Sequence, residues 1–181
     1  MAEKVRYERA VAEPIANELM TLLAPCCERL EIAGSLRRGS PTVGDIELLC
    51  IPKPAGNPLF FTDALDESVK AMIASGRLGL RPSIKGVTAY GSQNKLLTHV
   101  VSGIGVDIFS TTMENWGMAL VVRTGPAVFN IALMGRLRGM GKRGHAYGGI
   151  TLADGSGISC PTEESVFLEA GWPYIPPERR I

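Results

Sequence analysis

Apolar residues recur at the spacing of a helix in four stretches of the chain. In the first stretch, which runs to about Ala24, Pro14 interrupts the pattern, so the helix either contains this proline or begins there. The other three helices are expected over residues 63–75, 126–140 and 162–170. Residues 116–123 are apolar enough for either a helix or a strand, and their pattern leaves both open.

Strand patterns lie between these helices, and turn residues separate them. Such strands are expected over residues 30–33, 44–51, 80–111 and 147–160, with residues 104–110 as the clearest case. Residues 52–58 contain three prolines, which predicts a loop. Together these elements predict an α+β fold. It has a mixed or antiparallel sheet with helices on one face, followed by a small α/β subdomain.

The charge pattern changes near residues 111–115. The whole chain has a formal net charge of +1, which by itself does not indicate a nucleic-acid partner. Between Asn115 and Ala153, however, there is no acidic residue. We therefore expect a catalytic domain at residues 1–113 and a C-terminal subdomain at residues 114–181. The residues expected to contact DNA are Arg136, Arg138, Lys142 and Arg143, with a solvated helix face as the alternative.

Cysteine spacing and the lack of long apolar runs argue against several classes of protein. No pair of the four cysteines has CxxC spacing, so neither a zinc site nor a disulfide framework is expected. The charged first residues do not resemble a signal peptide, and no run reaches the roughly 18 apolar residues of a membrane helix. We expect a monomer without a membrane partner. It would be cytoplasmic or, if viral, lie in the host-cell compartment that holds DNA.

Three acidic residues stand in two of the expected strands. Asp45 and Glu47 alternate with apolar neighbours, so their side chains share one face at about 7 Å spacing. Asp107 lies among apolar residues in the strand at 104–110, where an unpaired acid is unfavourable. If the two strands are neighbours, the carboxylates converge and could hold two divalent cations, Mg²⁺ or Mn²⁺. A half-exposed strand whose acids face water is the alternative.

A turn of small residues precedes the acidic pair. Gly34 and Ser35 end the strand at residues 30–33, and Arg37 and Arg38 follow them. Backbone N–H groups at such a turn can bind phosphate, and serine and arginine side chains can add further donors. A helix cap with solvated arginines is the alternative. The position just upstream of the acidic pair favours binding of a nucleoside triphosphate.

These residues resemble the palm motif of family X DNA polymerases, the polymerase beta group. The run AGSLRRGSPTVGDIELL at residues 33–49 matches a GS-x-x-R-G turn followed by GD-hydrophobic-acid, and Asp107 in GVDIF matches the family's third acid. Thr124-Gly125 followed by Phe129-Asn130 resembles the TG…FN segment that opens the thumb helix. Residues 164–179 are similar to the closing segment, a helix followed by LGLPYIPP and Arg. The motifs occur in the family's order.

The resemblance implies a two-metal nucleotidyltransferase. Asp45 and Glu47 would hold both ions, and Asp107 would bind the catalytic ion and help to activate the primer 3′-hydroxyl. Ser35 and Arg38 would bind the triphosphate, while Gly125 would lie against the sugar and Asn130 would reach the base edge. The full set of implied nucleotide-binding residues is Gly34, Ser35, Arg38, Gly44, Thr124, Gly125 and Asn130.

The implied activity is that of a DNA-directed DNA polymerase that transfers dNMP from a dNTP to primer-template or gapped DNA. Short-gap filling in repair fits a minimal palm-plus-thumb form without lyase and fingers domains. Glu47 departs from the aspartate of the polymerases, and small-molecule nucleotidyltransferases of the same superfamily carry Asp-x-Glu. A transferase acting on a small molecule or protein, and a non-catalytic DNA-binding module, are the alternatives.

The family has an unusual cis peptide bond just after this Thr-Gly pair. Pro126 follows Gly125 here, and a cis X-Pro bond costs only about 0.5–1 kcal/mol. We therefore expect the Gly125–Pro126 bond to be cis.

Overall fold

The computed structural model describes residues 5–54, 63–82 and 86–180. Part of the loop expected at residues 52–58, and a few residues of the stretch expected to be strands at 80–111, lie outside them. By their contacts, the residues divide into two compact units. The first unit comprises Met1–Ile32 and Ser40–Ser110, and the second comprises Ala33–Gly39 and Thr111–Ile181.

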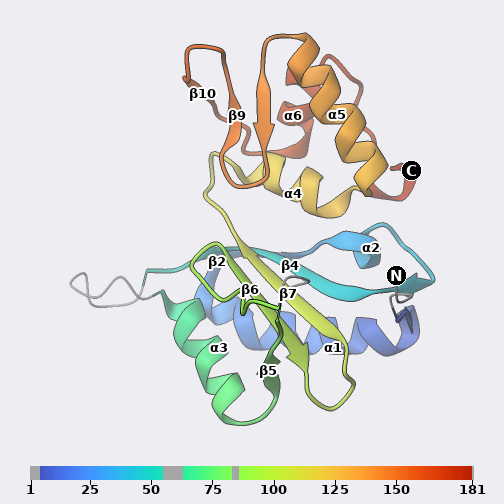
Figure 1. Ribbon diagram of the computed structural model, residues 1–181, viewed down its shortest axis with the longest axis vertical. Coiled ribbons are helices and arrows are strands. Elements are labelled where there is room, and N and C mark those ends of the chain that lie inside the picture. The colour runs from blue at the N-terminus through green and yellow to red at the C-terminus, as the bar shows by residue number, and fades with distance from the viewer. Residues whose placement is uncertain (1–4, 55–62, 83–85, 181) are drawn as a thin grey trace. The chain divides into compact units, whose positions relative to one another are not determined.

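Five strands of the described chain form a mixed sheet in the first unit (Figure 1). In sheet order they are β2 (Cys27–Ile32), β4 (Asp45–Pro52), β7 (Gly105–Ser110), β6 (Asn94–His99) and β5 (Leu78–Leu80). Strands β4 and β7 are parallel, and the other neighbouring pairs are antiparallel. The strands β1 (Tyr7–Glu8) and β3 (Thr42–Val43) form a separate, antiparallel two-stranded sheet. The expected mixed sheet is confirmed.

Two helices pack on one face of this sheet (Figure 1). Helix α1 (Arg9–Leu23) contacts β2 and β4, and α3 (Ala64–Ala74) contacts β5. A short 3₁₀ turn, η1 (Ala24–Cys26), follows α1. Pro14 lies inside α1, so of the two alternatives the helix that contains this proline is the one observed. Asp63 caps α3 by accepting a hydrogen bond from the backbone N–H of Asp66 at 2.5 Å.

Alternation along β4 separates its two faces. Ile46, Leu48 and Cys50 are fully buried, and they share the period-two face that packs on the helices. Asp45 and Glu47 are half-buried on the opposite face. The helix-facing core of this unit comprises Ala12, Ala16, Leu19, Leu23, Ile46, Leu48, Cys50, Leu65, Val69, Leu97, Val106 and Ile108.

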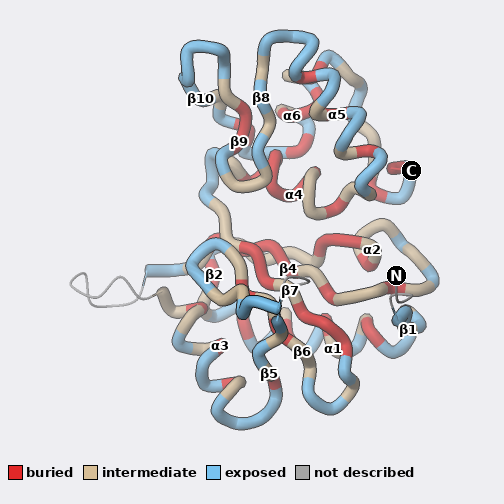
Figure 2. The backbone as a smooth tube through the Cα atoms, viewed as in Figure 1, coloured by how far each residue is buried: buried red, intermediate tan, exposed pale blue. Residues whose placement is uncertain are grey.

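The second unit builds a small α/β structure around its own core (Figure 2). Its elements are α2 (Gly34–Arg37), α4 (Trp116–Thr124), α5 (Ala127–Gly139), β8 (Arg143–His145), β9 (Gly149–Thr151), β10 (Gly157–Ile158), α6 (Glu163–Glu169) and the 3₁₀ turn η2 (Pro177–Arg179). Strands β8, β9 and β10 form an antiparallel sheet, with β9 in the middle. The core includes Met118, Val121, Phe129, Leu133, Leu137, Ile150, Val166 and Phe167.

Helix α4 explains why residues 116–123 read as either helix or strand. Six consecutive residues from Trp116 to Val121 are buried, so the helix has no polar face that would reveal its period. Gly117 permits this packing, because a Cβ atom there would overlap the carbonyl oxygen of Thr162 at the start of α6. The backbone N–H of Gly117 donates to the carbonyl of Cys160 at 2.8 Å.

The expected cis bond between Gly125 and Pro126 is wrong, because this bond is trans. Both residues take ordinary extended angles, with φ −70° and ψ 150° at Gly125 and φ −68° and ψ 162° at Pro126. The chain can therefore leave α4 and enter α5 without a cis bond.

Among the helices of the described chain, none has the length and apolar character needed to cross a membrane.

Candidate functional site

The three candidate carboxylates lie on one face of the sheet in the first unit. Glu47 on β4 is the direct register partner of Asp107 on β7, and Asp45 is the partner of Gly105. Adjacent strands are about 4.8 Å apart, and register partners in a parallel pair share a face. The two strands that carry the acids are therefore neighbours, which is the condition under which the sequence placed the carboxylates together.

The carboxylates do not form a preassembled metal cluster. Among the described residues, no three His, Cys, Asp or Glu side chains converge closely enough to hold a metal ion. Instead, the guanidinium of Arg81 donates a hydrogen bond to Asp107 and forms an ion pair with it. Like charges on neighbouring strands repel one another, so an aspartate here gains from a cationic partner when no metal is present.

The donor set nevertheless fits a hard divalent cation. Its ligands would be carboxylate oxygens from Asp45, Glu47 and Asp107, which is the chemistry that Mg²⁺ and Mn²⁺ prefer. Two of these residues are register partners and the third is two residues along the same strand.

The predicted phosphate-binding turn is helix α2 of the second unit. Gly34 is buried with φ +63°, a left-handed conformation that glycine adopts readily, and Ser35 is half-buried. Gly44 lies between β3 and β4, directly before Asp45, in the first unit. Gly34 and Ser35 thus directly follow β2 and begin α2, which Arg37 ends and Arg38 caps.

A buried ion network anchors α2 within its unit. Glu163 at the start of α6 accepts two hydrogen bonds from Arg37, at 2.7 and 2.9 Å, and one from Arg180 at 2.7 Å. The hydroxyl of Tyr174 adds a contact of 3.3 Å. Burial raises the pKa of Glu163, but the hydrogen bonds from Arg37 and Arg180 outweigh burial, so its pKa is lowered.

The end of α4 also holds α2. The Thr124 side chain is fully buried and accepts a hydrogen bond from Arg37 at 3.0 Å, while its carbonyl accepts one from Arg38. Both predicted members of the nucleotide site, Arg38 and Thr124, are therefore in direct contact. At least one N–H group of Arg38 donates to Thr124 in the structure.

Gly125 and Asn130 lie together at the turn between α4 and α5. The Asn130 side-chain amide donates to the carbonyl of Val122 at 2.7 Å, and its own Oδ1 is buried without a hydrogen-bond partner. A Cβ atom at Gly125 would lie 2.7 Å from this Oδ1 and 2.9 Å from the Phe129 ring, so only glycine fits without a shift. Asn130 thus stabilises the turn through its amide group.

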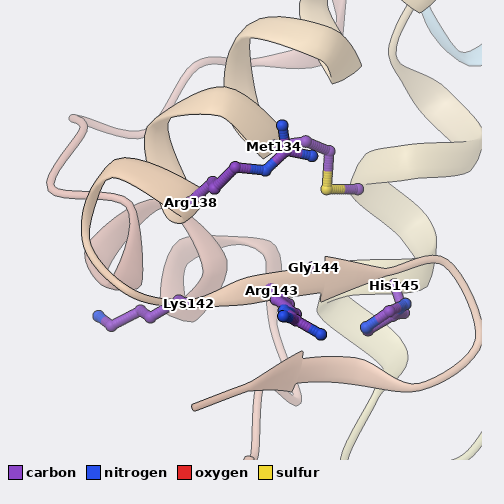
Figure 3. Close-up of a pocket in the computed structure, with 6 residues that line it drawn as sticks. All are labelled: Met134, Arg138, Lys142, Arg143, Gly144 and His145. Atoms are coloured by element: carbon purple, nitrogen blue, oxygen red, sulfur yellow. The ribbon is translucent and has the colours of Figure 1, made fainter. Parts of the chain in front are cut away.

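The basic residues of the second unit fall into two groups. Arg136 donates to the carbonyl of Ala170 at 2.9 Å, and Lys142 pairs with the Glu169 carboxylate at 2.7 Å, so both hold the end of α6. Arg138 and Arg143 are exposed. They line a pocket of about 410 Å³ whose walls are Met134, Arg138, Lys142, Arg143, Gly144 and His145 (Figure 3).

Two features of the site were not predicted. Arg81 and Glu163 lie outside the recognised motifs, and their partners are 26 and 126 residues away along the chain. Glycine at position 105, two residues before Asp107, leaves the space that Arg81 fills, but the sequence does not reveal which side chain enters it. Glu163 stands between Thr162 and Glu164, so its sequence neighbours give no sign that it is buried.

Residues 119–181 match the family model of the DNA polymerase beta thumb. The fold resembles that of Leishmania infantum polymerase beta, solved as a ternary P/T complex, with a TM-score of 0.76 and 18% sequence identity. This match covers 98% of the chain described here and 77% of the Leishmania chain. The C-terminal part of the chain is thus similar to a polymerase beta thumb, and the fold as a whole is similar to that of the Leishmania protein. No curated protein sequence matches this chain.

Several predicted site residues lie within the segment that matches the thumb model. Thr124, Gly125 and Asn130 fall inside the matched segment, as do the basic residues of α5 and β8. The carboxylates lie outside it, in the sheet whose fold resembles the Leishmania protein. The mixed α/β architecture expected from the sequence is thereby confirmed.

Proposed function

We propose that this protein is a DNA polymerase that adds dNMP to a primer 3′-hydroxyl by two-metal catalysis, filling short gaps during DNA repair. The observation that carries the proposal is the register of β4 and β7, which sets Glu47 beside Asp107 with Asp45 on the same face. The like charges of a pair of acids held this way repel one another, and a divalent cation would offset this repulsion more fully than the single charge of Arg81 does. The polymerase beta fold and thumb support DNA and a dNTP as substrates.

The three carboxylates would hold two Mg²⁺ ions, with Mn²⁺ as a substitute. Asp45 and Glu47 would contact both ions, and Asp107 would contact the ion nearer the primer. When bound, the ions would lower the pKa of the primer hydroxyl and offset charge on the phosphates. Because the sheet fixes the three backbone positions, the protein supplies ligands whose spacing changes little during the reaction.

The residues of the second unit would bind the nucleotide. Ser35 and Arg38 would donate to the triphosphate, and the network around Glu163 would keep α2 in a fixed orientation. Thr124 supports this helix through Arg37 and Arg38. Gly125 would lie against the sugar, and Asn130 would reach the base edge of the incoming nucleotide.

Arg138 and Arg143 would contact the DNA backbone. They are exposed and belong to a span without any acidic residue, which removes local competition for phosphate groups. Arg136, which is also exposed, and Lys142 would share this role, while their contacts with Ala170 and Glu169 hold the end of α6.

Primer extension on a duplex with a one-nucleotide gap tests the proposal. Each dNTP is supplied separately with Mg²⁺ or Mn²⁺, and the wild type is compared with Asp107→Ala. We expect the correct dNTP to be added and the variant to lose at least about 100-fold in rate, as is typical when a directly acting group is removed. Glu31→Gln, which changes an acid on β2 of the same sheet, is the matched control and should extend normally.

Glu47 favours one second candidate, a transferase that places a nucleotide on a small molecule or protein. Its carboxylate is one methylene longer than that of aspartate, which changes the reach of a metal ligand by about 1.5 Å. If folded protein binds Mg²⁺ and dNTP but extends no primer with either metal, the DNA polymerase proposal is overturned in favour of this candidate.

A further inference from the structure

Arg81 reaches the carboxylate face from the β5 edge of the sheet. It directly follows β5, and its backbone N–H donates to the carbonyl of Leu96 on β6 at 3.1 Å. Leu96 is in turn the register partner of Asp107 on β7. The guanidinium therefore extends across β6 and meets Asp107 within one row of the sheet.

Gly105 makes room for this guanidinium. A Cβ atom at Gly105 would lie 2.7 Å from Nη1 and 2.9 Å from Cζ of Arg81, too close for any other residue to fit without a shift. Gly105 is two residues before Asp107, so both share the same face of β7, and its register partner is Asp45. Arg81 thus places its charge on the face of the three carboxylates, at the level of Asp45.

The contact of Arg81 is partly shielded but incompletely satisfied. The side chains of Arg81 and Asp107 are 30% and 13% exposed, so water weakens their ion pair less than it would at an open surface. The Arg81 Nε atom is buried without a hydrogen-bond partner, which makes this position less favourable for the side chain. A side chain held by such a contact can be displaced by a stronger cation.

We propose that Arg81 is the counter-cation of Asp107 in the metal-free protein, and that it competes with the metal ion for this carboxylate. This proposal rests on the metal binding in the proposed function. Arg81 supplies one positive charge where a divalent ion would supply two, so a bound ion would repel the guanidinium and favour its departure from Asp107. Arg81 then acts as a positioning residue that weakens metal binding while keeping the carboxylate ordered.

Metal binding by an Arg81→Met variant tests this competition without any measurement of turnover. Mn²⁺ affinity is measured by electron paramagnetic resonance, and the melting temperature is measured in EDTA and in Mg²⁺. We expect the variant to melt lower in EDTA, to gain more from Mg²⁺, and to bind Mn²⁺ about threefold more tightly or better, since a pair of this kind contributes up to a few-fold in affinity. Arg77→Met removes the ion pair with Glu18 and is the matched control, with unchanged affinity.

A second variant tests the same competition and keeps the Arg81 side chain. In Gly105→Ala the new methyl group must push the Arg81 guanidinium away, so Mn²⁺ affinity should again rise. Circular dichroism establishes that each variant is folded. If one variant does not fold, the other decides.

The outcomes separate this proposal from the proposed function. If the wild type binds Mn²⁺ and the folded variants bind it equally or more weakly, Arg81 does not compete and the proposal is overturned, while the proposed function stands. If neither the wild type nor the variants bind the ion, both are overturned. Binding gained by the variants supports the competition, including where the wild type binds too weakly to detect.

Discussion

Glu163 illustrates how a single charge can organise the second unit. Its carboxylate is 5% exposed and lies between Arg37 and Arg180, whose side chains are 20% and 0% exposed. Burying one acid between two arginines is tolerable only because hydrogen bonds satisfy both oxygens. Removing the carboxylate would take away the counter-charge that the buried Arg180 and the half-buried Arg37 share.

Glu163→Gln is expected to lower the free energy of unfolding by about 3 kcal/mol or more, the usual effect of breaking a buried ion pair. Chemical denaturation at neutral pH measures it. Glu164→Gln, which alters the exposed neighbouring acid, is the control and should change stability by less than about 0.5 kcal/mol. Equal losses in the two variants would show that the network contributes little.

The same residue predicts a dependence on pH. The pKa of Glu163 is lowered in the folded state, because the hydrogen bonds from Arg37 and Arg180 outweigh burial. Its stabilisation is therefore complete above the unfolded pKa of about 4.3 and is lost as the pH falls through the folded-state value. The wild type should lose more unfolding free energy than Glu163→Gln between about pH 5 and about pH 3. Parallel stability curves for the two proteins would contradict this.

At the scale of elements, the close packing of α4 on α6 decides the shape of the second unit. Gly117 lies against the carbonyl of Thr162, and Thr162 caps α6 in a reciprocal arrangement with Ser165. The α4 backbone thus sits where it can help to place Glu163, the first residue of α6. Helix α5 also contains a glycine, Gly135, but this residue is exposed and no atom lies near its Cβ position.

Gly117→Ala and Gly135→Ala should therefore have opposite effects on thermal stability. The first introduces a methyl group into the α4–α6 contact and should cost more than about 3 kcal/mol. The second adds a good helix former in open space and should stabilise the protein by about 0.5–1 kcal/mol. Thermal unfolding of the two variants beside the wild type measures both. A stable Gly117→Ala protein would mean that the two helices can separate readily.

For the whole molecule, a net charge of +1 conceals an uneven distribution. The acids that would bind metal lie in the first unit, whereas the span from Asn115 to Ala153 contains bases and no acid. Long-range attraction to DNA thus depends on where the charges lie and not on their sum.

DNA affinity should accordingly fall steeply with salt, because phosphate contacts release counterions. In a plot of log affinity against log salt, Arg143→Ala should reduce the slope by about 1. Arg29→Ala is the control, since Arg29 pairs with Glu31 on β2 and should leave the slope unchanged. Fluorescence anisotropy with a gapped duplex at several salt concentrations measures this. A flat salt response in the wild type would argue against phosphate contacts.

The sequence by itself determined the features that depend on local backbone geometry. Strand alternation set Asp45 and Glu47 on one face, and helical spacing predicted α3, α5 and α6, because period and capping act over a few residues. It could not decide α4, whose buried surface has no polar face to reveal the helical period. The cis bond expected at Pro126 was wrong, because a low energetic cost permits that isomer without selecting it.

The tertiary structure alone decided which distant residues meet. The parallel register that sets Glu47 beside Asp107, the ion pair of Arg81 with Asp107 and that of Arg37 with Glu163 join residues 26 to 126 positions apart. Such pairings depend on the order of strands and on the space left by glycines such as Gly105 and Gly117. The local sequence pattern does not indicate these pairings, because the partner of a side chain is selected by packing and charge once the chain has folded.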